Sequence, residues 1–333
     1  MMNSYTGQSV GIGVVVSKQQ IELDGNLQTV LQIEHVVSES PAKEAGLQVG
    51  DYVVSVGSGE SKQTVHELGY EAAVERVRGD AGTLAEFTVY RATASGYDSM
   101  PFSVTRKAVT SESVIYGKVE GTDHVGMVRI LEFNYTTPGQ FSAAIDALRL
   151  QGCDSFVFDL RYNPGGLLVS ICAVLSFFLD PGQLILSTTE KSGEGEVYYA
   201  KTMSEEVDGV TVTESDLGKY KGLNSVVLCN EETASAAELF VANFRDYKLA
   251  KIVGTKTFGK GSVQNPYSLF PYGIDGFLKL TIAYYYPPCG EGYDGIGIEP
   301  DVLVDMTEEE KNQFNFYKIQ SDAQLTEALK LLG

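Results

Sequence analysis

Three polar side chains in the second half of the sequence have the types and spacing that serine hydrolysis needs. Ser235 lies in NEETASAAE, Lys260 follows it by 25 residues in TFGKGSVQ, and Gln264 follows Lys260 by four residues. A serine hydroxyl becomes a nucleophile when a neighbouring base takes its proton, and a neutral lysine amine is one such base. In an extended segment Lys260 and Gln264 project to one face, where the Gln264 amide oxygen could orient the amine without adding charge.

Each of these residues also has an ordinary structural interpretation. Ser235 and Glu238 fit a capping box at a helix start, in which Ser covers an N–H of the first turn and Glu reaches back. Lys260 would be a solvated charge, because a free lysine has a pKa of about 10.4 and lowering it to about 7 costs about 4.6 kcal/mol, which only burial provides. From these two segments alone, the structural interpretation is preferred.

A Ser-His-Asp triad would need a histidine close to Ser235. The sequence has only three histidines, and none of them lies in the α/β segment that follows Val125: His35, His66 and His124. We therefore interpret the histidines as surface or loop residues, and a nucleophilic Ser235 would need another base.

A third segment, DLRYNPGG, runs from a buried strand into a glycine turn and then an apolar helix. Backbone N–H groups at such a helix N-terminus stabilise developing negative charge. The candidate donors to an oxyanion are the N–H groups of Gly165 or Gly166 together with that of Ala236, and Gly166 is the preferred loop donor. Asp159 and Arg161 are expected to form a structural ion pair rather than to act in catalysis.

The elements around these residues predict two domains. After an N-terminal tail, residues 1–9, we expect a small, mostly β domain over residues 10–92 and a polar loop over 93–101. The evidence for the small domain is four runs rich in β-formers, at 10–17, 29–37, 52–56 and 85–91, and one helical stretch at 69–77.

The remaining residues, 93–333, predict an α/β core. Strands and helices alternate there, which implies a largely parallel sheet. The expected strands are 125–131, 156–160, 225–229 and 277–286, and the expected helices are 138–150, the segment after Gly166, 234–247 and 322–332. Residues 187–222 are polar and rich in Gly and Glu, so a surface excursion is expected around them.

Length and charge limit the classes of function. A chain of 333 residues is long enough for about two domains with sizeable cores. The net charge of −19 argues against binding to nucleic acid or to an anionic membrane, since both need basic patches. The four cysteines, with no CxxC motif and no neighbouring histidine, predict buried thiols rather than a zinc site or a disulfide framework: Cys153, Cys172, Cys229 and Cys289. No cofactor and no metal are expected.

The N-terminal residues and the longest apolar run bear on membrane targeting. The first nine residues have no charged region followed by an apolar one, so no signal peptide is predicted. The run Leu167–Leu179 is shorter than the roughly 20 residues of a membrane helix and is interpreted as a core helix. The abrupt start before GIGVVV suggests that an N-terminal part is missing.

These segments, in this order, resemble the carboxyl-terminal processing (tail-specific) proteases over nearly the whole chain. GIGVVV and ESPAKEAGLQVGD resemble parts of a PDZ domain, and RGDAGT, VGMVRILEF, DLRYNPGG, NEETASAAE, VGTKTFGKGSVQ and GIGIEPD follow. The family has Asn, three residues, Ala-Ser-Ala and a Glu around its nucleophile, its base 25 residues later and a Gln four after that. The departures are small: Glu232 and Thr233 replace the usual Gly-Ser, and Cys289 lies in a Pro-x-Gly turn that usually has a smaller residue.

The resemblance implies the fold and the catalytic residues. The expected fold class is α/β, with a protease core of the crotonase or ClpP type and a small, mostly β PDZ domain. The expected activity is that of a serine endopeptidase in which Ser235 is the nucleophile, Lys260 the base and Gln264 its support. It also implies work outside the cytoplasm, in the periplasm, the cell envelope or the medium, and is compatible with a homo-oligomer.

The resemblance further implies protein substrates with free, apolar C-termini. The loop Gly11, Ile12, Gly13 and Val14 would capture the terminal carboxylate through its N–H groups, although a simple strand-entry turn is the structural alternative. Arg78 could couple occupancy of the PDZ domain to the core, or could form only a structural ion pair.

Two other functions are compatible with parts of the pattern. A catalytically silent PDZ adaptor would bind protein C-termini without cutting them, and the intact Ser235, Lys260 and Gln264 argue against it. Acyl-CoA chemistry on the same scaffold is disfavoured by the acidic charge and by the lack of a basic phosphate site.

Overall fold

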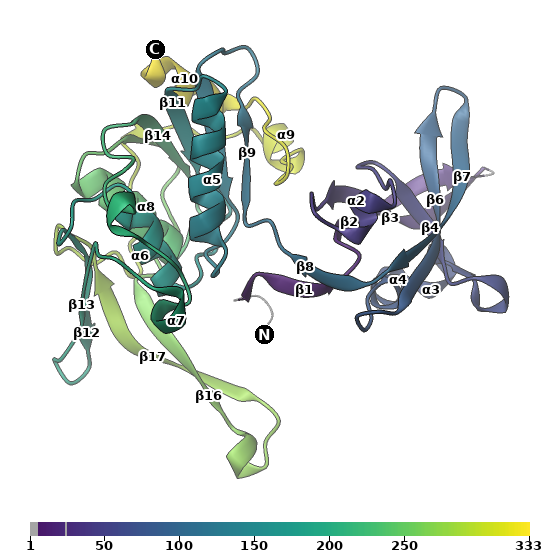
Figure 1. Ribbon diagram of the computed structural model, residues 1–333, viewed down its shortest axis with the longest axis horizontal. Helices are drawn as coiled ribbons and strands as arrows, with labels where there is room; N and C mark the ends of the chain where they lie inside the picture. Colours follow the sequence, from purple (N-terminus) through teal and green to yellow (C-terminus); the bar gives the residue numbers. More distant parts are fainter. Residues whose placement is uncertain (1–5, 24) are drawn as a thin grey trace. The chain divides into compact units, whose positions relative to one another are not determined.

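The computed structural model describes residues 6–23 and 25–333 (Figure 1). The chain divides into two compact units, Met1–Glu112 and Ser113–Gly333. Each unit has a hydrophobic core of its own.

The first unit is built on an antiparallel sheet with the order β2-β3-β4-β6-β7. These strands are Val14–Leu23, Asn26–Val36, Tyr52–Val56, Leu84–Thr93 and Gly96–Thr105. Three helices, α2 (Pro41–Glu44), α3 (Val65–Leu68) and α4 (Tyr70–Val77), contribute buried side chains to the core of the sheet. The short strand β5 (Gln63–Thr64) pairs with β4, and β1 (Gln8–Gly11) pairs with β8 (Lys107–Thr110).

The expected loop over residues 93–101 is corrected by the structure. Thr93 and Gly96 close a tight hairpin, and β7 continues from Gly96 to Thr105 as a full partner of β6. The side chains of β7 are mostly exposed, so its sequence has the polarity of a loop although its backbone is paired. The small unit therefore extends beyond residue 92 and ends at Glu112.

The second unit contains the parallel sheet that the alternation of strands and helices predicts. Its order is β18-β15-β14-β11-β10-β9, and all neighbours are parallel except β9 and β10. In chain order, the strands of this sheet are β9 (Val114–Lys118), β10 (Val125–Ile130), β11 (Ser155–Asp159), β14 (Asn224–Cys229), β15 (Lys251–Gly254) and β18 (Val302–Leu303).

Helices cover both faces of this sheet. Helices α5 (Thr137–Leu150), α6 (Leu168–Ser176) and α8 (Ala236–Asp246) pack on one face, with Phe156 and Phe158 of β11. Helix α10 (Ala323–Leu332) packs on the other face, with Val157. This alternation along β11 explains why its three central residues, Phe156 to Phe158, are all apolar.

Helix α6 is the predicted core helix. Every residue from Ser170 to Ser176 is buried, and α6 packs beside α5 and α8. Among the helices of the described residues, none has the length and apolar character needed to cross a membrane.

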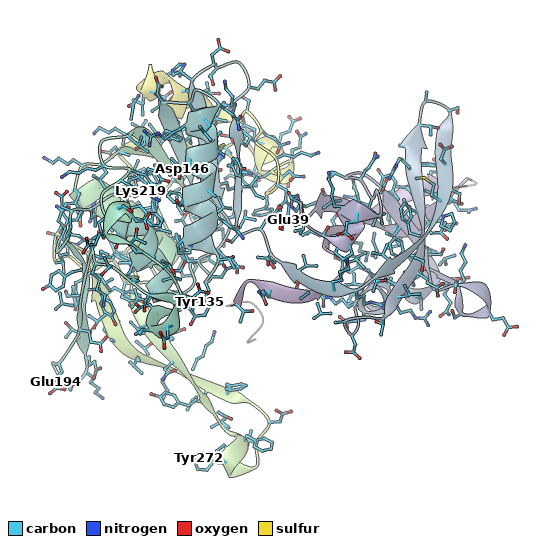
Figure 2. The ribbon with its side chains drawn as sticks, in the orientation of Figure 1. Glu39, Tyr135, Asp146, Glu194, Lys219 and Tyr272 are labelled. Atoms are coloured by element: carbon cyan, nitrogen blue, oxygen red, sulfur yellow. The ribbon has the colours of Figure 1, made fainter. Side chains whose placement is uncertain are left out.

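A second, antiparallel sheet has the order β13-β12-β17-β16. In chain order, its strands are β12 (Leu184–Glu190), β13 (Val197–Tyr199), β16 (Ser262–Ser268) and β17 (Phe277–Tyr286). Strands β16 and β17 extend beyond the rest of their unit as a two-stranded ribbon, with Tyr272 at its far end (Figures 1 and 2). The residues that connect the two strands include a short 3-10 turn, Phe270–Tyr272.

The predicted surface excursion around 187–222 is more ordered than expected. It contains parts of β12, all of β13 and the helix α7 (Glu205–Asp208). Five of its apolar side chains are buried in the main core: Ala200, Met203, Val210, Val212 and Tyr220. Polar residues separate these buried side chains in the sequence, so the segment as a whole has the composition of a surface loop.

Helix α9 (Glu308–Asn312) lies near the C-terminus.

Three of the four cysteines are buried, as predicted, but Cys289 is exposed. It lies in the turn that follows β17, where its Sγ accepts a hydrogen bond from Nη2 of Arg245 at 3.3 Å. The prediction failed there because it relied on residue type alone.

Candidate active site

The candidate site lies where two neighbouring parallel strands, β11 and β14, end. The segments that follow them contain DLRYNPGG and NEETASAAE, and a backbone hydrogen bond joins the two, from the N–H of Ala234 to the carbonyl of Asn163 at 2.9 Å. Loops at the carboxyl ends of parallel strands are the usual place for binding sites in α/β folds. The sheet topology therefore brings the predicted glycine turn to the predicted nucleophile.

Two buried asparagines fix these loops. Oδ1 of Asn230 accepts the N–H of Tyr162 at 2.9 Å, across the two loops. Oδ1 of Asn163 accepts the N–H of Gly165 at 2.8 Å, and its Nδ2 donates to the carbonyl of Ile130 at 2.8 Å. Side-chain amides thus replace the ladder hydrogen bonds that the backbone loses where the strands end.

Ser235 is the N-cap residue of α8 and is 9% exposed. Its backbone has φ 57° and ψ −120°, a conformation that residues with a side chain rarely adopt. Only Tyr162, Ser235 and Lys248 have positive φ among the described residues other than glycine, and two of these three lie in the site loops. Strain of this kind persists where the surroundings enforce it, and it is concentrated at functional sites.

Glu238, one turn into α8, binds both loops through its buried carboxylate. Its Oε2 accepts the N–H groups of Ser235 and Lys260, at 2.9 and 2.7 Å. Its Oε1 accepts the hydroxyl of Thr257 at 2.6 Å and the N–H of Gly259 at 2.7 Å. The half of the predicted capping box in which Glu reaches back to Ser235 is therefore present, and the same carboxylate also positions the lysine segment.

Burial raises the pKa of the Glu238 carboxyl above its ordinary value, while its four hydrogen-bond donors act in the opposite direction. All four partners donate, so the ionised carboxylate is the form whose hydrogen bonds match the surroundings. Protonation of Glu238 would leave an O–H facing a donor.

The segment that carries Lys260 is held at several further points. The N–H of Phe258 donates to the carbonyl of Thr233 at 3.0 Å, which links the segment to the nucleophile loop. The N–H of Gly261 donates to Oδ1 of Asp294 at 2.9 Å. Gly259 has φ +90°, and a Cβ there would lie 2.8 Å from the N of Gly297, so the close approach predicted for this glycine is present.

The side chains of the three predicted catalytic residues are not hydrogen-bonded to one another in this structure. Lys260 is half-buried, and within the described residues its ammonium group makes no hydrogen bond or ion pair. Gln264 is exposed on β16 and lies opposite Thr281. The structure thus joins Ser235 and Lys260 through their backbones, on Glu238, and leaves Oγ of Ser235 and Nζ of Lys260 beyond hydrogen-bonding distance.

The glycine turn that contains the predicted loop donors lies beside Ser235. A Cβ on Gly165 would lie 2.8 Å from Cβ of Ser235 and 2.9 Å from the N of Ala236, so the glycine turn contacts the start of α8 directly. The N–H of Gly165 is already engaged by Asn163. Neither Gly166 nor Ala236 donates its N–H to another described residue. Gly166 and Ala236 therefore remain the available pair of donors.

The expected ion pair between Asp159 and Arg161 is confirmed, and it belongs to a larger buried group. Oδ1 of Asp159 accepts Nε of Arg161 at 2.8 Å, and its Oδ2 accepts Nε of Arg129 at 2.8 Å. Nη1 of Arg161 donates to Asp322, the N-cap residue of α10, at 2.8 Å. The two carboxylates, of Asp159 and Asp322, balance the charges of Arg129 and Arg161. This buried ion group connects the end of β11 to the C-terminal helix α10.

The residues predicted to bind a terminal carboxylate lie at the edge of the first unit. Gly11 ends β1, and Ile12 is buried in the core of that unit. Gly13 has φ +83° and lies so close to Ser40 that a Cβ would clash, while Val14 begins β2, which is an edge strand of the described sheet. Arg78 is exposed and forms the local ion pair with Glu75 at 2.9 Å, which is the structural alternative foreseen for it.

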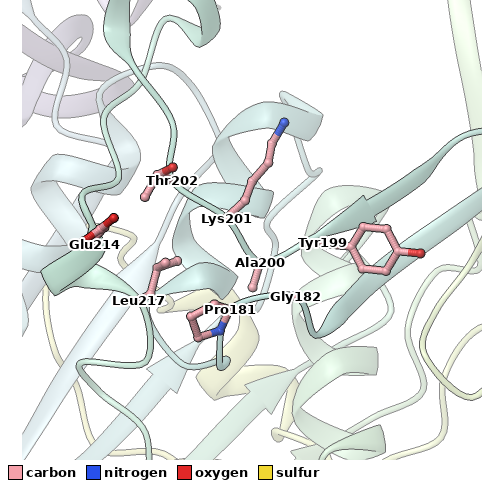
Figure 3. A pocket seen from close by; sticks show the side chains of 8 residues that line it. All are labelled: Pro181, Gly182, Tyr199, Ala200, Lys201, Thr202, Glu214 and Leu217. Atoms are coloured by element: carbon pink, nitrogen blue, oxygen red, sulfur yellow. The ribbon is translucent and has the colours of Figure 1, made fainter.

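A pocket of about 740 Å³ in the second unit is lined by other residues (Figure 3). It is formed by the segments around Gly182, Ala200 and Leu217, and Lys201 and Glu214 are its charged lining residues. No serine, cysteine or histidine lines it, and none of the predicted catalytic residues does. It is therefore not a candidate for the catalytic site.

Two family models match the chain. The model of peptidase family S41 matches residues 124–304, more than half of the chain, and the model of a PDZ domain matches residues 32–91. The chain belongs to peptidase family S41. The expected fold class, an α/β core of this family with a β-rich PDZ domain near the N-terminus, is confirmed. The loop Gly11–Val14 precedes the residues that the PDZ model matches.

Relatives of this S41 chain include bacterial processing proteases. A carboxy-terminal-processing protease of Bartonella bacilliformis is 32% identical over 93% of this chain and 65% of its own length. The carboxy-terminal processing protease CtpA of Bacillus subtilis is 30% identical over 89% of this chain and 56% of its own. The chain thus spans between about half and two thirds of the length of these relatives. An S41 protease structure from Bacteroides fragilis has a TM-score of 0.60 at 19% identity, over 97% of this chain and 83% of its own, and shows the same fold.

Proposed function

We propose that this S41 chain is a serine endopeptidase of the carboxyl-terminal processing type. Ser235 is the nucleophile, Lys260 is the general base and Gln264 orients the lysine amine. The observation that supports this most is the carboxylate of Glu238, which holds the backbones of Ser235 and Lys260 on one oxygen atom. A structural cap alone would not require the lysine segment to meet the same carboxylate.

In the proposed reaction, the neutral amine of Lys260 takes the proton of the Ser235 hydroxyl while Oγ attacks the carbonyl carbon of a peptide bond. The N–H groups of Gly166 and Ala236 stabilise the oxyanion that forms. The lysine then gives its proton to the leaving amine, and a water molecule hydrolyses the acyl-enzyme by the same route. Because the two side chains are not hydrogen-bonded here, binding of substrate has to bring Nζ to Oγ.

The PDZ domain selects the substrates in this proposal. A free carboxylate occurs once in each chain, so its capture by the N–H groups near Gly13 would direct cleavage to C-terminal tails of many sequences. An apolar last residue would enter a pocket formed in part by Ile12 and Val14, while the edge strand β2 pairs with the peptide. The PDZ domain would act on substrates outside the cytoplasm.

One experiment tests the assignment of the dyad. The purified chain is incubated with an unfolded protein, and cleavage is compared among wild type, Ser235→Ala, Lys260→Ala and Gln264→Ala. The serine and lysine variants should each lose cleavage to a similar extent and non-additively, because the two groups act as one unit, and the glutamine variant should lose less. Full activity in Lys260→Ala would exclude the proposed base.

A second function is favoured by one observation. The ammonium of Lys260 and the hydroxyl of Ser235 are apart in this structure, as they would be in an adaptor that binds C-termini without cutting them. In that case the wild-type chain would bind the unfolded protein, and no cleavage would appear in any of the four proteins.

A further inference from the structure

The ribbon formed by β16 and β17 exposes many large apolar side chains. Nine of them are between 37% and 78% exposed: Tyr267, Phe270, Tyr272, Ile274, Phe277, Leu278, Leu280, Ile282 and Tyr284. At about 200 Å² for a large side chain, they present on the order of 1,000 Å² of accessible surface. The largest apolar patch on a monomeric protein is usually about 300–600 Å², so an apolar surface of this size indicates an interaction site.

One face of the ribbon continues the face that packs on the core. On β16, Val263 packs against the core and lies opposite the buried Ala283. Further along the same face, Asn265 lies opposite Leu280, and Tyr267 lies opposite Leu278. These outer leucines and the tyrosine are 45–46% exposed, because the core ends before they do. We call this surface, defined by Tyr267, Leu278 and Leu280, the outer ribbon face.

We propose that the outer ribbon face and the apolar tip of the ribbon bind the same surface of a second copy of this chain. A two-fold interface is self-complementary, so one patch serves both partners. A standard interface buries about 800 Å² on each partner, which matches the apolar area of the ribbon. Two such faces, stacked sheet on sheet, would cover the leucines that the core leaves open.

The charge of the ribbon supports a second copy. The whole chain has a net charge of −19, but residues 262–286 carry only Asp275 and Lys279. Two copies would repel each other over most of their surfaces and can approach without like-charge repulsion at the neutral ribbon. One acid and one base in each copy also provide opposite charges across a symmetric contact.

The backbone of the ribbon favours a protein partner over a lipid bilayer. Within the described residues, the outer edge of β16 is unpaired, and β17 pairs with β12 only from Ala283 to Tyr286. Free N–H and C=O groups along both edges would be costly in hydrocarbon, whereas water can reach them beside a stacked partner.

Sedimentation equilibrium of the 333-residue chain tests this proposal. Wild type should approach twice 36.1 kDa as its concentration rises through the micromolar range. The double variant Leu278→Glu and Leu280→Glu buries carboxylates at the contact and should weaken association by about 100-fold or more. Thr281→Glu adds a carboxylate to the same ribbon but on the opposite face, beside Gln264 and away from the tip, and should associate nearly as wild type does.

Hydrogen exchange of the wild type gives a second test that needs no variant. Backbone amides that pair β16 with β17 within residues 265–282 should be protected more strongly at high than at low protein concentration, because the partner stabilises the paired ribbon, while those of β11 should not change. A wild type that stays monomeric throughout, or equal effects of the two ribbon variants, would overturn the proposal. Monomeric wild type that binds uncharged lipid vesicles or an unfolded polypeptide through the ribbon would overturn it in favour of those partners.

Discussion

Glu238 and Lys260, 22 residues apart in the sequence, meet through a hydrogen bond of 2.7 Å from the lysine N–H to Oε2 of the carboxylate. The same oxygen accepts the N–H of Ser235. This buried carboxylate accepts four hydrogen bonds and so fixes the backbones of the proposed nucleophile and base relative to each other. Replacing it with a side chain that also donates should displace both backbones.

Glu238→Gln should therefore lower kcat for peptide cleavage by about 10- to 100-fold, because hydrogen bonds to a charged group contribute about 1.5–3 kcal/mol each. The new amide N–H₂ must face backbone N–H groups or the Thr257 hydroxyl. KM should change less than kcat. The matched control is Glu232→Gln, an exposed residue of the same loop.

The pH profile separates positioning from a general loss of structure. Since burial raises the pKa of Glu238, wild-type activity should fall on the acidic side as the carboxylate takes up a proton. The Gln variant should lack the part of this decline that comes from Glu238 and keep the part that comes from protonation of the general base. A variant with wild-type kcat and an unchanged pH profile would show that Glu238 does not position the dyad.

Gly165→Ala should abolish most cleavage. Its Cβ would lie 2.8 Å from Cβ of Ser235 and 2.9 Å from the N of Ala236, so either the proposed oxyanion donors or the proposed nucleophile must shift. Gly152→Ala is the control, because Gly152 has a similar φ, +89°, but open space around it. It carries the backbone strain without the clash and should retain activity. Equal loss in both variants, measured as kcat/KM on one peptide, would assign the effect to strain alone.

Asp159→Asn should destabilise the second unit by about 3–5 kcal/mol, because it leaves Arg129 and Arg161 buried with one charge too few. Urea unfolding monitored by circular dichroism measures this loss. Asp123→Asn, an exposed position, should stay within about 0.5 kcal/mol of wild type. Similar midpoints for the two variants would mean that the buried ion group contributes little.

The same residue makes stability depend on pH. Burial alone would raise the pKa of Asp159, but Arg161 and Arg129 lower it to about 2. A carboxyl whose folded pKa is lower than its unfolded one, about 3.9, stabilises the fold above that unfolded value and loses this contribution as pH falls toward 2. The free energy of unfolding of wild type should thus decline between about pH 4 and 2, and that of Asp159→Asn should decline less. Parallel curves for the two proteins would exclude Asp159 as the source.

Capture of a substrate C-terminus predicts a simple chemical dependence. A peptide with an apolar last residue and a free carboxylate should bind at least about tenfold more tightly than the same peptide with an amidated end, because the amide lacks the charge that the N–H groups near Gly13 are proposed to bind. Calorimetry on Ser235→Ala measures binding without cleavage. Equal affinity for the two peptides would remove this mechanism and leave the dyad untouched.

The elements that carry the site were predictable because their apolar runs are unambiguous. The strand before DLRYNPGG and the helix after Ser235 lie where the pattern places them, at β11 and α8. Strand β7 was missed because an exposed edge strand and a loop share the same polar composition. The buried side chains of residues 187–222 were missed because isolated apolar residues, such as Val212, do not form the repeating pattern that indicates a helix or a strand.

The hydrogen bonds of Glu238 were only partly predictable. Spacing within one helix turn indicates that it can reach back to Ser235, which the structure confirms. Nothing in the local sequence shows that it also accepts from Thr257, Gly259 and Lys260, because that depends on how two distant loops fold together. The separation of the Ser235 and Lys260 side chains was likewise beyond any spacing argument.

In the proposed reaction Ser235 forms the acyl-enzyme, and mass spectrometry of the digested chain can detect that adduct and locate it. Turnover of a peptide ester is quenched with acid, and the digest is searched for the acyl adduct. We expect an adduct on the peptide that contains Ser235, which should be reduced in Lys260→Ala and absent from Ser235→Ala. An adduct on any other residue, or wild-type turnover by Ser235→Ala, would contradict it.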